Sequence, residues 1–120
     1  MTDTPPPPGG DAPARPPGSL DRVFDVLSHS SRRRILTVLA EANPRTDEEF
    51  TPAELRTERD DSERFRMELH HRHFPKLEQA GYIDWDRESG TVRRGPNYDE
   101  IASLVELLAT HEDELPGGWP

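Results

Sequence analysis

The sequence contains no cysteine, and Lys76 is the one lysine among its 15 basic residues. The absence of cysteine excludes a disulfide framework and a metal site built from thiolates. The chain also has no apolar run near the roughly 20 residues that a membrane-spanning helix needs, and its proline-rich start lacks the apolar segment of a signal peptide. These absences predict a soluble, cytoplasmic protein without a membrane partner.

Length and composition predict one small domain with two extensions. Residues 1–18 hold more than half of the 13 prolines and no apolar periodicity, which predicts a disordered tail. Residues 19–97 form the expected core, residues 98–115 a C-terminal helix for dimerisation, and residues 116–120 a flexible end. Such a core is small, and dimerisation would add to its buried apolar area.

The net charge of −9 argues against nucleic-acid binding at first sight, because nucleic-acid-binding proteins usually carry a basic surface. The acidic residues are unevenly placed, however. Residues 19–97 contain 14 basic and 16 acidic side chains, whereas residues 98–120 contain six acidic side chains and no Arg or Lys. An acidic surface poor in lysine is typical of a cytoplasm with high salt. Phosphate contacts are weak there, so a DNA-binding protein depends more on geometry and base contacts.

The segment that starts at Thr51 carries the start signals of two consecutive helices. Thr51 is placed to cap the first with Pro52 at its first position, and Glu54 completes a capping box. Asp60 and Glu63 repeat this spacing nine residues later, which leaves room for about two turns of helix and a tight turn. A β-hairpin is expected after the second helix. This order predicts a winged helix-turn-helix, a mainly α fold with a small β-hairpin (α+β) that inserts one helix into a DNA groove.

Two further helices are expected before this segment. Apolar side chains recur at helical spacing, the polar run 28–31 separates the two helices, and Asn43 and Pro44 end the second. The apolar positions are Leu20, Val23, Phe24 and Leu27 in the first helix and Ile35, Val38, Leu39 and Ala42 in the second. Three arginines, residues 32–34, crowd the first turn of the second helix, where the helix dipole disfavours positive charge. They are interpreted either as a grip on phosphate or as solvated side chains paired with the acids at positions 21 and 25.

The second helix of the motif is expected to be long and irregular. Pro75 removes one backbone hydrogen bond, which predicts a kink near His71, and Gly81 is expected to end the helix. The inward-facing positions are expected to be Met67, Phe74, Leu77 and Ala80, with Phe65 and Leu69 in a neighbouring row.

Alternating side chains predict strands over residues 82–86 and 91–94, joined by a turn at residues 87–90. Phe50 is expected at the end of a further short strand beside this hairpin. Asn97 is expected to cap the last helix, with Glu100 three residues later. The apolar stripe of this helix is Ile101, Leu104, Val105 and Leu108.

Basic and imidazole side chains concentrate on the long helix and on the hairpin. Arginine reads guanine or holds phosphate, and neutral histidine donates or accepts at a base edge. The wing arginines are placed to touch backbone phosphate or the minor groove. The predicted DNA-contacting residues are Arg64, Arg66, His70, His71, Arg72 and Lys76 on the helix and Arg87, Arg93 and Arg94 in the wing. In the alternative interpretation, the arginines pair with Asp61, Glu63, Glu68, Asp84, Asp86 and Glu88.

Other kinds of site find little support in the sequence. His70, His71 and His73 cluster within four residues, but neighbours on a helix point about 100° apart and cannot converge on one ion. His111 and Glu114 are interpreted as part of a charged helix end. The sequence has no glycine-rich phosphate loop, nucleophile elbow or paired-carboxylate motif with supporting context. We therefore expect no enzyme activity, no metal site and no cofactor.

Two strings carry a resemblance to a known family. Residues 26–36, VLSHSSRRRIL, resemble the second-helix signature of the ArsR-type winged-helix repressors. Residues 73–83, HFPKLEQAGYI, are similar to the end of their recognition helix and its entry into the wing. The chain is also similar, over roughly residues 19–110, to small haloarchaeal helix-turn-helix regulators with a histidine-rich helix.

The resemblance implies a homodimer with an outer helix pair in its interface, and promoter binding as a repressor or regulator. It matches His71, Arg72 and His73 to the segment that approaches the groove. The metal-sensing branch of the family uses cysteine thiolates, which this chain lacks, or a histidine early in the last helix, where Ile101 stands. The resemblance therefore does not support metal sensing, and the effector is unknown.

The sequence thus predicts a sequence-specific transcriptional regulator, a repressor that binds double-stranded DNA as a homodimer. The predicted dimer interface contains Leu20, Phe24, Ile101, Leu104, Val105 and Leu108. The net charge of −9 supports a rival hypothesis, in which a winged helix has become a protein-interaction module that does not bind DNA.

Overall fold

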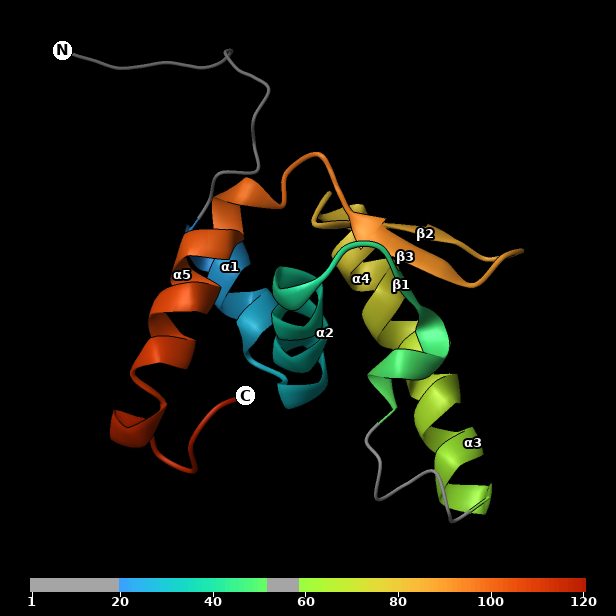
Figure 1. Cartoon of the computed structure of the whole chain (residues 1–120), viewed down its shortest axis with the longest axis horizontal. Coiled ribbons are helices and arrows are strands. Elements are labelled where there is room, and N and C mark those ends of the chain that lie inside the picture. Colours follow the sequence, from blue (N-terminus) through green and yellow to red (C-terminus); the bar gives the residue numbers. More distant parts are fainter. Residues whose placement is uncertain (1–19, 52–58) are drawn as a thin grey trace, which may run out of the picture.

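The computed structural model describes residues 20–51 and 59–120. In this part of the chain, helices predominate and a three-stranded antiparallel sheet completes an α+β fold, as the sequence predicts. Helix α2 (Ser30–Glu41) lies at the centre, with α1 (Leu20–Leu27) and α5 (Asp99–Thr110) on one side and the sheet on the other (Figure 1). The predicted tail and the predicted helix after Thr51 lie outside the described residues.

The first two helices are separated at the predicted polar run. On α1, the buried side chains are Val23, Val26 and Leu27. His29 caps α2, because its Nδ1 accepts a hydrogen bond from the backbone N–H of Ser31 at 3.1 Å. The fully buried apolar side chains of α2 are Ile35, Leu36 and Leu39. The helical spacing predicts Ile35 and Leu39 correctly but misses Leu36, while Val38 is only half-buried and Ala42 is exposed.

One long helical segment consists of α3 (Arg59–Glu68), a π-helical turn η4 (Leu69–His73) and α4 (Phe74–Gln79). The backbone N–H of Phe74 donates to the carbonyl of Leu69, five residues earlier, as is typical of a π turn. The irregularity directly precedes Pro75 and lies where that proline predicts a kink.

Two expectations for this segment are wrong. Asp60 already lies inside α3, so it does not cap the helix in a box with Glu63. Met67 is 61% exposed rather than inward-facing, because α3 extends beyond the core that α4 helps to form.

The sheet has the order β1-β3-β2, with β1 (Arg45–Thr46), β2 (Ile83–Asp86) and β3 (Thr91–Arg94). The predicted hairpin is confirmed, and Gly81 precedes it with a φ of 81°, the left-handed conformation expected at a helix end. The third strand lies earlier than predicted. Phe50 belongs instead to a short 3₁₀ helix, η2 (Asp47–Phe50), and its side chain is fully buried.

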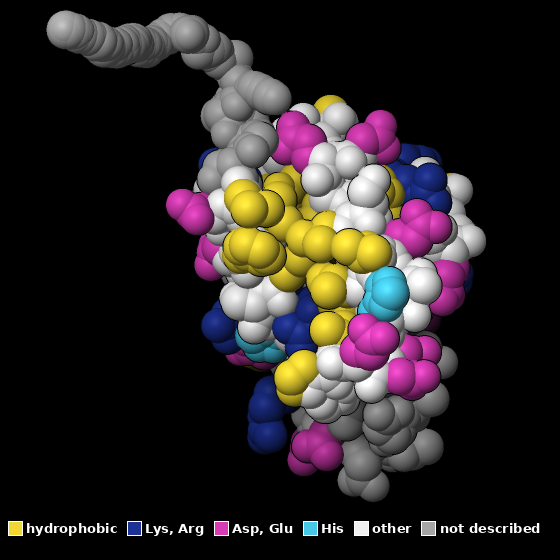
Figure 2. Space-filling view, turned by 90° about the vertical axis from the view of Figure 1, so that its left-hand side faces the viewer, with side chains coloured by type: hydrophobic (Ala, Val, Ile, Leu, Met, Phe, Trp, Pro, Cys, Tyr) yellow, Lys and Arg dark blue, Asp and Glu magenta, His cyan; other side chains and the backbone are white. Residues whose placement is uncertain are grey.

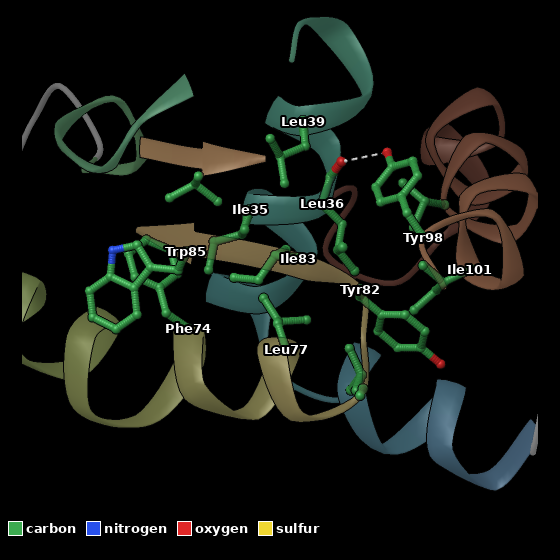
Figure 3. Close-up of a cluster of buried hydrophobic side chains, with 14 of the residues drawn as sticks. Ile35, Leu36, Leu39, Phe74, Leu77, Tyr82, Ile83, Trp85, Tyr98 and Ile101 are labelled. Carbon is green, nitrogen blue, oxygen red and sulfur yellow. Dashed lines mark hydrogen bonds between the residues drawn. The ribbon is translucent and has the colours of Figure 1, made fainter. Parts of the chain in front are cut away.

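The core joins α2, α4, the hairpin and α5 (Figure 3). Tyr98 donates from its hydroxyl to the carbonyl of Leu36 at 3.3 Å and so ties the start of α5 to α2. Asn97 is not the expected cap of this helix, because its side-chain amide donates to the carbonyl of Ala80. The labelled core residues in the close-up are Ile35, Leu36, Leu39, Phe74, Leu77, Tyr82, Ile83, Trp85, Tyr98 and Ile101.

The C-terminal residues fold back onto α2, in a region where the sequence predicts a flexible end. The indole Nε1 of Trp119 donates to the hydroxyl of Thr37 at 3.1 Å, and the guanidinium of Arg33 lies 5.9 Å from the Trp119 ring centroid. Trp119 packs against the edge of the hydrophobic core.

Candidate nucleic-acid interface

The long helix and the hairpin hold most of the side chains predicted to contact DNA. In Figure 1, α3 and the turn of the hairpin both project on the side of the molecule away from α5. The buried face of the helix, with Leu69, His73, Phe74 and Leu77, fixes it to the core. Its opposite face is therefore available to a partner.

Three predicted residues lie exposed on the long helix. The Arg64 side chain is 78% exposed, and its Nη1 lies 3.9 Å from Oδ1 of Asp61. The Arg72 side chain is 59% exposed, and its Nη1 lies 3.4 Å from Oε1 of Glu68. His71 is also exposed. Both interpretations of the sequence thus apply here, because the arginines are accessible and are also paired with carboxylates.

Arg66 is exposed but lies on another side of α3. It lines a recess with Thr46, Glu49 and Ser62, close to η2. Glu49 in turn accepts from Arg45 Nη1 at 2.6 Å. Arg66 therefore lies beside η2, apart from Arg64.

His70 is half-buried and packs against aromatic side chains of the fold. Its ring centroid lies 5.0 Å from that of Trp85 and 5.7 Å from that of Phe74. Its Nε2 lies 3.2 Å from Oδ2 of Asp47. Burial lowers the pKa of His70, while the Asp47 carboxylate opposes this shift. Because Asp47 also donates its backbone N–H to the carbonyl of Gly90 at 2.7 Å, His70 helps to fix the hairpin turn against the helix.

Lys76 also contributes to the fold. Its Nζ lies 2.7 Å from Oδ2 of Asp25, and this contact holds the pKa of the Asp25 carboxyl below its usual value. The contact joins α4 to α1. Lys76 is therefore less available for phosphate than the sequence predicts.

Arg87 is the predicted DNA-contacting residue in the hairpin turn, and its side chain lies back against the hairpin. Its guanidinium carbon is 4.2 Å from the Trp85 ring centroid, and its Nη2 is 3.3 Å from Oε1 of Glu78. Arg93 is exposed on β3, opposite Asp84 of β2. These two arginines lie in the hairpin, each near a carboxylate.

Arg94 serves as an anchor for the sheet. Its Nε donates to the carbonyl of Leu39 at 2.9 Å, and its Nη2 donates to that of Ala40 at 3.2 Å. Its guanidinium also lies 5.2 Å from the Tyr98 ring centroid. These bonds satisfy carbonyls in the last turn of α2, which have no partner within the helix. Arg94 is exposed, but its guanidinium is bound to these carbonyls, so it is less available for DNA than the sequence predicts.

The arginines at the start of α2 also bind backbone carbonyls. Arg32 donates from Nε to the carbonyl of Val26 at 2.8 Å, and Arg33 donates from Nη1 to that of Leu27 at 2.7 Å. These carbonyls belong to the last turn of α1, so the arginines compensate for missing helical hydrogen bonds. Arg32 is only 4% exposed, which excludes it from a grip on phosphate in this conformation.

Sequence reasoning missed a buried cluster formed by Arg32, His29 and His73. His73 is 1% exposed, and its ring centroid lies 4.3 Å from that of His29. Burial is the largest cause that lowers the pKa of His73, to about 4, and the neighbouring cations lower it further. His73 thus acts as a neutral acceptor in the core and not as a groove-facing residue. The close spacing of arginines and histidines around positions 29–33 and 70–73 was the available signal.

The predicted dimer-interface residues fall into two groups. Ile101 and Val105 are buried within the chain itself, at 0% and 1% exposure, so they cannot face a partner without unfolding. The remaining residues belong to an apolar face formed by α1 and α5, part of which is visible in Figure 2. We define this apolar face as Leu20, Phe24 and Leu107, which are exposed, with the half-buried Leu104 and Leu108.

In the described part of the chain, no helix has the length and apolar character needed to cross a membrane. Within the same ranges, residues 20–51 and 59–120, no three His, Asp or Glu side chains are grouped so that they could hold a metal ion.

Comparison with known proteins assigns the chain to a family. No curated protein and no solved structure matches it. Residues 24–93, more than half of the 120-residue chain, match a family described as a domain of unknown function (DUF7344). The match extends from α1 through the long helix to β3. The chain therefore belongs to the DUF7344 family.

Proposed function

We propose that the protein is a winged-helix regulator that binds double-stranded DNA sequence-specifically. The observation that carries the proposal is the exposure of Arg64, His71 and Arg72 on a helix beside a two-stranded hairpin that carries Arg87 and Arg93. The order of the described elements, a long helix followed by a hairpin, fits this proposal. The resemblance of residues 26–36 and 73–83 to ArsR-type repressors supports the same assignment.

In this proposal, the long helix enters the major groove and the hairpin contacts the flanking backbone. Arg72 and His71 present hydrogen-bonding groups to base edges, and Arg64 contacts a base or phosphate near the start of the helix. Arg87 and Arg93 contact phosphate or the minor groove. Lys76, His70 and Arg94 hold the helix and the wing in place, because their side chains are bound within the fold.

The regulator would act as a homodimer in the cytoplasm and repress transcription. The apolar face of α1 and α5 offers the surface for a second copy, because it leaves large apolar side chains in water. Two copies related by a two-fold axis would place their recognition helices about 34 Å apart, which favours a palindromic site.

The experiment that tests the proposal is a selection of binding sites from a random-sequence duplex library, followed by anisotropy titration in molar potassium chloride. We expect an enriched palindromic sequence that binds more tightly than a shuffled duplex of the same composition. Failure to enrich any sequence, with a protein that melts cooperatively, would refute sequence-specific binding.

A second candidate function is a protein-interaction module that does not bind DNA. The observation that favours it is the pairing of Arg64, Arg72 and Arg87 with carboxylates, on a chain of net charge −9. The same selection distinguishes the two functions, since the interaction module would bind no duplex at any salt concentration.

A further inference from the structure

Two carboxylates on the long helix accompany the arginines of the proposed DNA-binding face. Glu68 on α3 lies 3.4 Å from Arg72, one helical turn away. Glu78 on α4 lies 3.3 Å from Arg87, which belongs to the hairpin turn. Each carboxylate therefore pairs with an arginine that would contact DNA, one on the long helix and the other in the hairpin turn.

Glu78 is held in place by a second contact. Its Oε2 accepts from the backbone N–H of Trp85 at 3.4 Å, while Oε1 faces Arg87. The Arg87 guanidinium is at the same time stacked over the Trp85 ring. The carboxylate thus draws Arg87 back along the hairpin, toward the helix.

We propose that Glu68 and Glu78 determine the selectivity of the interface by suppressing binding to arbitrary DNA. This inference rests on the proposed function. In the free protein the two carboxylates neutralise Arg72 and Arg87, and near a duplex they repel phosphate. A contact with phosphate alone must therefore displace an ion pair. Since exposed ion pairs are weak, a bidentate contact with the correct base can still displace them.

The physical consequence is a low electrostatic contribution to non-specific binding. Non-specific affinity comes from neutralised phosphates and the counterions that they release. When an arginine that is already paired with a carboxylate binds DNA, fewer counterions are released from the phosphates. Selectivity rises because the affinity for every sequence falls, while base contacts at the correct site are retained.

The test uses the full chain and the variants Glu68→Gln, Glu78→Gln and the double variant. Glu106→Gln is the matched control for each single variant, because Glu106 is exposed on α5 and its substitution also changes the net charge by one. Each protein is titrated against a fluorescein-labelled 30-base-pair duplex of shuffled sequence and against the duplex that the unmodified chain selects. The glutamine at position 78 retains an oxygen that can accept from Trp85.

We expect the double variant to bind the shuffled duplex about three- to tenfold more tightly than the unmodified chain does. Its affinity for the selected duplex should rise less, so the ratio of the two affinities should fall. The salt dependence on the shuffled duplex should steepen by about one in log–log slope for each arginine released. Glu106→Gln should leave all three quantities unchanged.

Three other outcomes would overturn the inference. If the unmodified chain selects a duplex but the double variant binds the shuffled duplex no more tightly, the inference fails and the proposed function stands. An equal gain in Glu106→Gln would assign the effect to net charge. If neither the unmodified chain nor any variant binds DNA, the proposed function fails and the inference fails with it. Should Glu78→Gln lower the melting temperature, Glu68→Gln alone decides the result, because Glu68 makes its ion pair at an exposed position.

Discussion

Arg32 and His73, which lie 41 positions apart in the sequence, form a hydrogen bond in the core: Nη1 of Arg32 donates to Nδ1 of His73 at 3.1 Å. The same guanidinium donates to the carbonyl of Asp25 at 3.2 Å and to the hydroxyl of Ser28 at 3.3 Å. The arginine therefore joins the end of α1 and the start of α2 to the π turn of the long helix. Each guanidinium nitrogen of this buried arginine has a hydrogen-bond partner. Removing the arginine or one of its partners is therefore expected to lower the stability of the fold.

We predict that Arg32→Ala lowers the free energy of unfolding by about 2–4 kcal/mol. The reason is that it leaves Nδ1 of His73 and the carbonyl of Val26 without their donor in a buried place. Arg64→Ala is the matched control, because the Arg64 side chain is 78% exposed. It should change stability by less than about 0.5 kcal/mol. Urea denaturation of the three proteins measures both effects, and equal effects in the two variants would contradict a structural role for Arg32.

The pH dependence of the free energy of unfolding should reflect the protonation of His73. Its folded pKa is lowered from 6.5 to about 4, so the unfolded chain binds the proton more tightly than the folded chain does. Stability is therefore greatest above pH 6.5 and is lost as the pH falls toward about 4, by on the order of 3 kcal/mol. The charged or titratable groups that affect His73 are His29, Arg32, Arg72 and Glu68. Because burial also lowers the pKa of His29, that residue adds a loss of the same sign.

His73→Gln provides the control for this prediction. It removes the titrating ring while keeping a side chain that can accept from Arg32, so the loss of stability between pH 6.5 and 4.5 should become smaller. Carboxylates act in a lower range, since the hydrogen bond from Arg45 lowers the pKa of Glu49 from 4.5 to about 2. An unchanged profile in His73→Gln, measured by urea denaturation at each pH, would show that His73 is not responsible.

Local signals predicted much of the fold. The helical spacing of Ile35 and Leu39, the proline at position 75 and the glycine at position 81 each act over a few residues, and the structure has the expected elements there. The errors concern features that depend on distant contacts. Asn97 was expected to cap the last helix, but its amide is engaged by the carbonyl of Ala80, 17 positions earlier. Met67 fits the inward spacing, but α3 extends beyond the core there.

The candidate site was less predictable, because residue type does not show whether a cation faces solvent or the fold. Arg72 and Arg94 have the same chemistry and both lie near the predicted groove-facing elements. Only the tertiary structure places Arg94 against the carbonyls at the end of α2, 54 and 55 positions earlier. The sequence likewise places Ile101 and Leu104 on one stripe, although Ile101 is fully buried and Leu104 is half-buried.

We predict that Arg72→Ala weakens specific DNA binding by about 1–3 kcal/mol without unfolding the protein. Arg72 lies exposed beside His71 on the proposed reading surface, and its ion pair with Glu68 is solvated. The anisotropy titration on the selected duplex measures the loss, and a melting curve checks the fold. Arg94→Ala is the contrasting variant, which should lower the melting temperature because Arg94 anchors β3 to α2. Unchanged affinity in a folded Arg72→Ala protein would remove Arg72 from the reading surface.

The last prediction concerns the dimer. Leu20 is 61% exposed and Phe24 is 56% exposed, so both can be changed without disturbing the core. We expect Leu20→Glu combined with Phe24→Glu to raise the dimer dissociation constant at least about 100-fold, because two acidic groups would have to lose water in an apolar interface. Leu104 and Leu108 are less suitable for this test, since both also pack against the core of their own chain.

Met67→Glu is the matched control for the dimer, because Met67 is equally exposed at 61% but lies on α3, outside the apolar face. Light scattering at tens of micromolar should find the unmodified chain and Met67→Glu dimeric, and the double variant monomeric with an unchanged melting curve. The monomer should also lose most of its affinity for a palindromic duplex, since each half-site would then be bound alone. A monomeric unmodified chain would refute the dimer. The exposed leucines and Phe24 would then have to serve a different partner, as the interaction-module hypothesis requires.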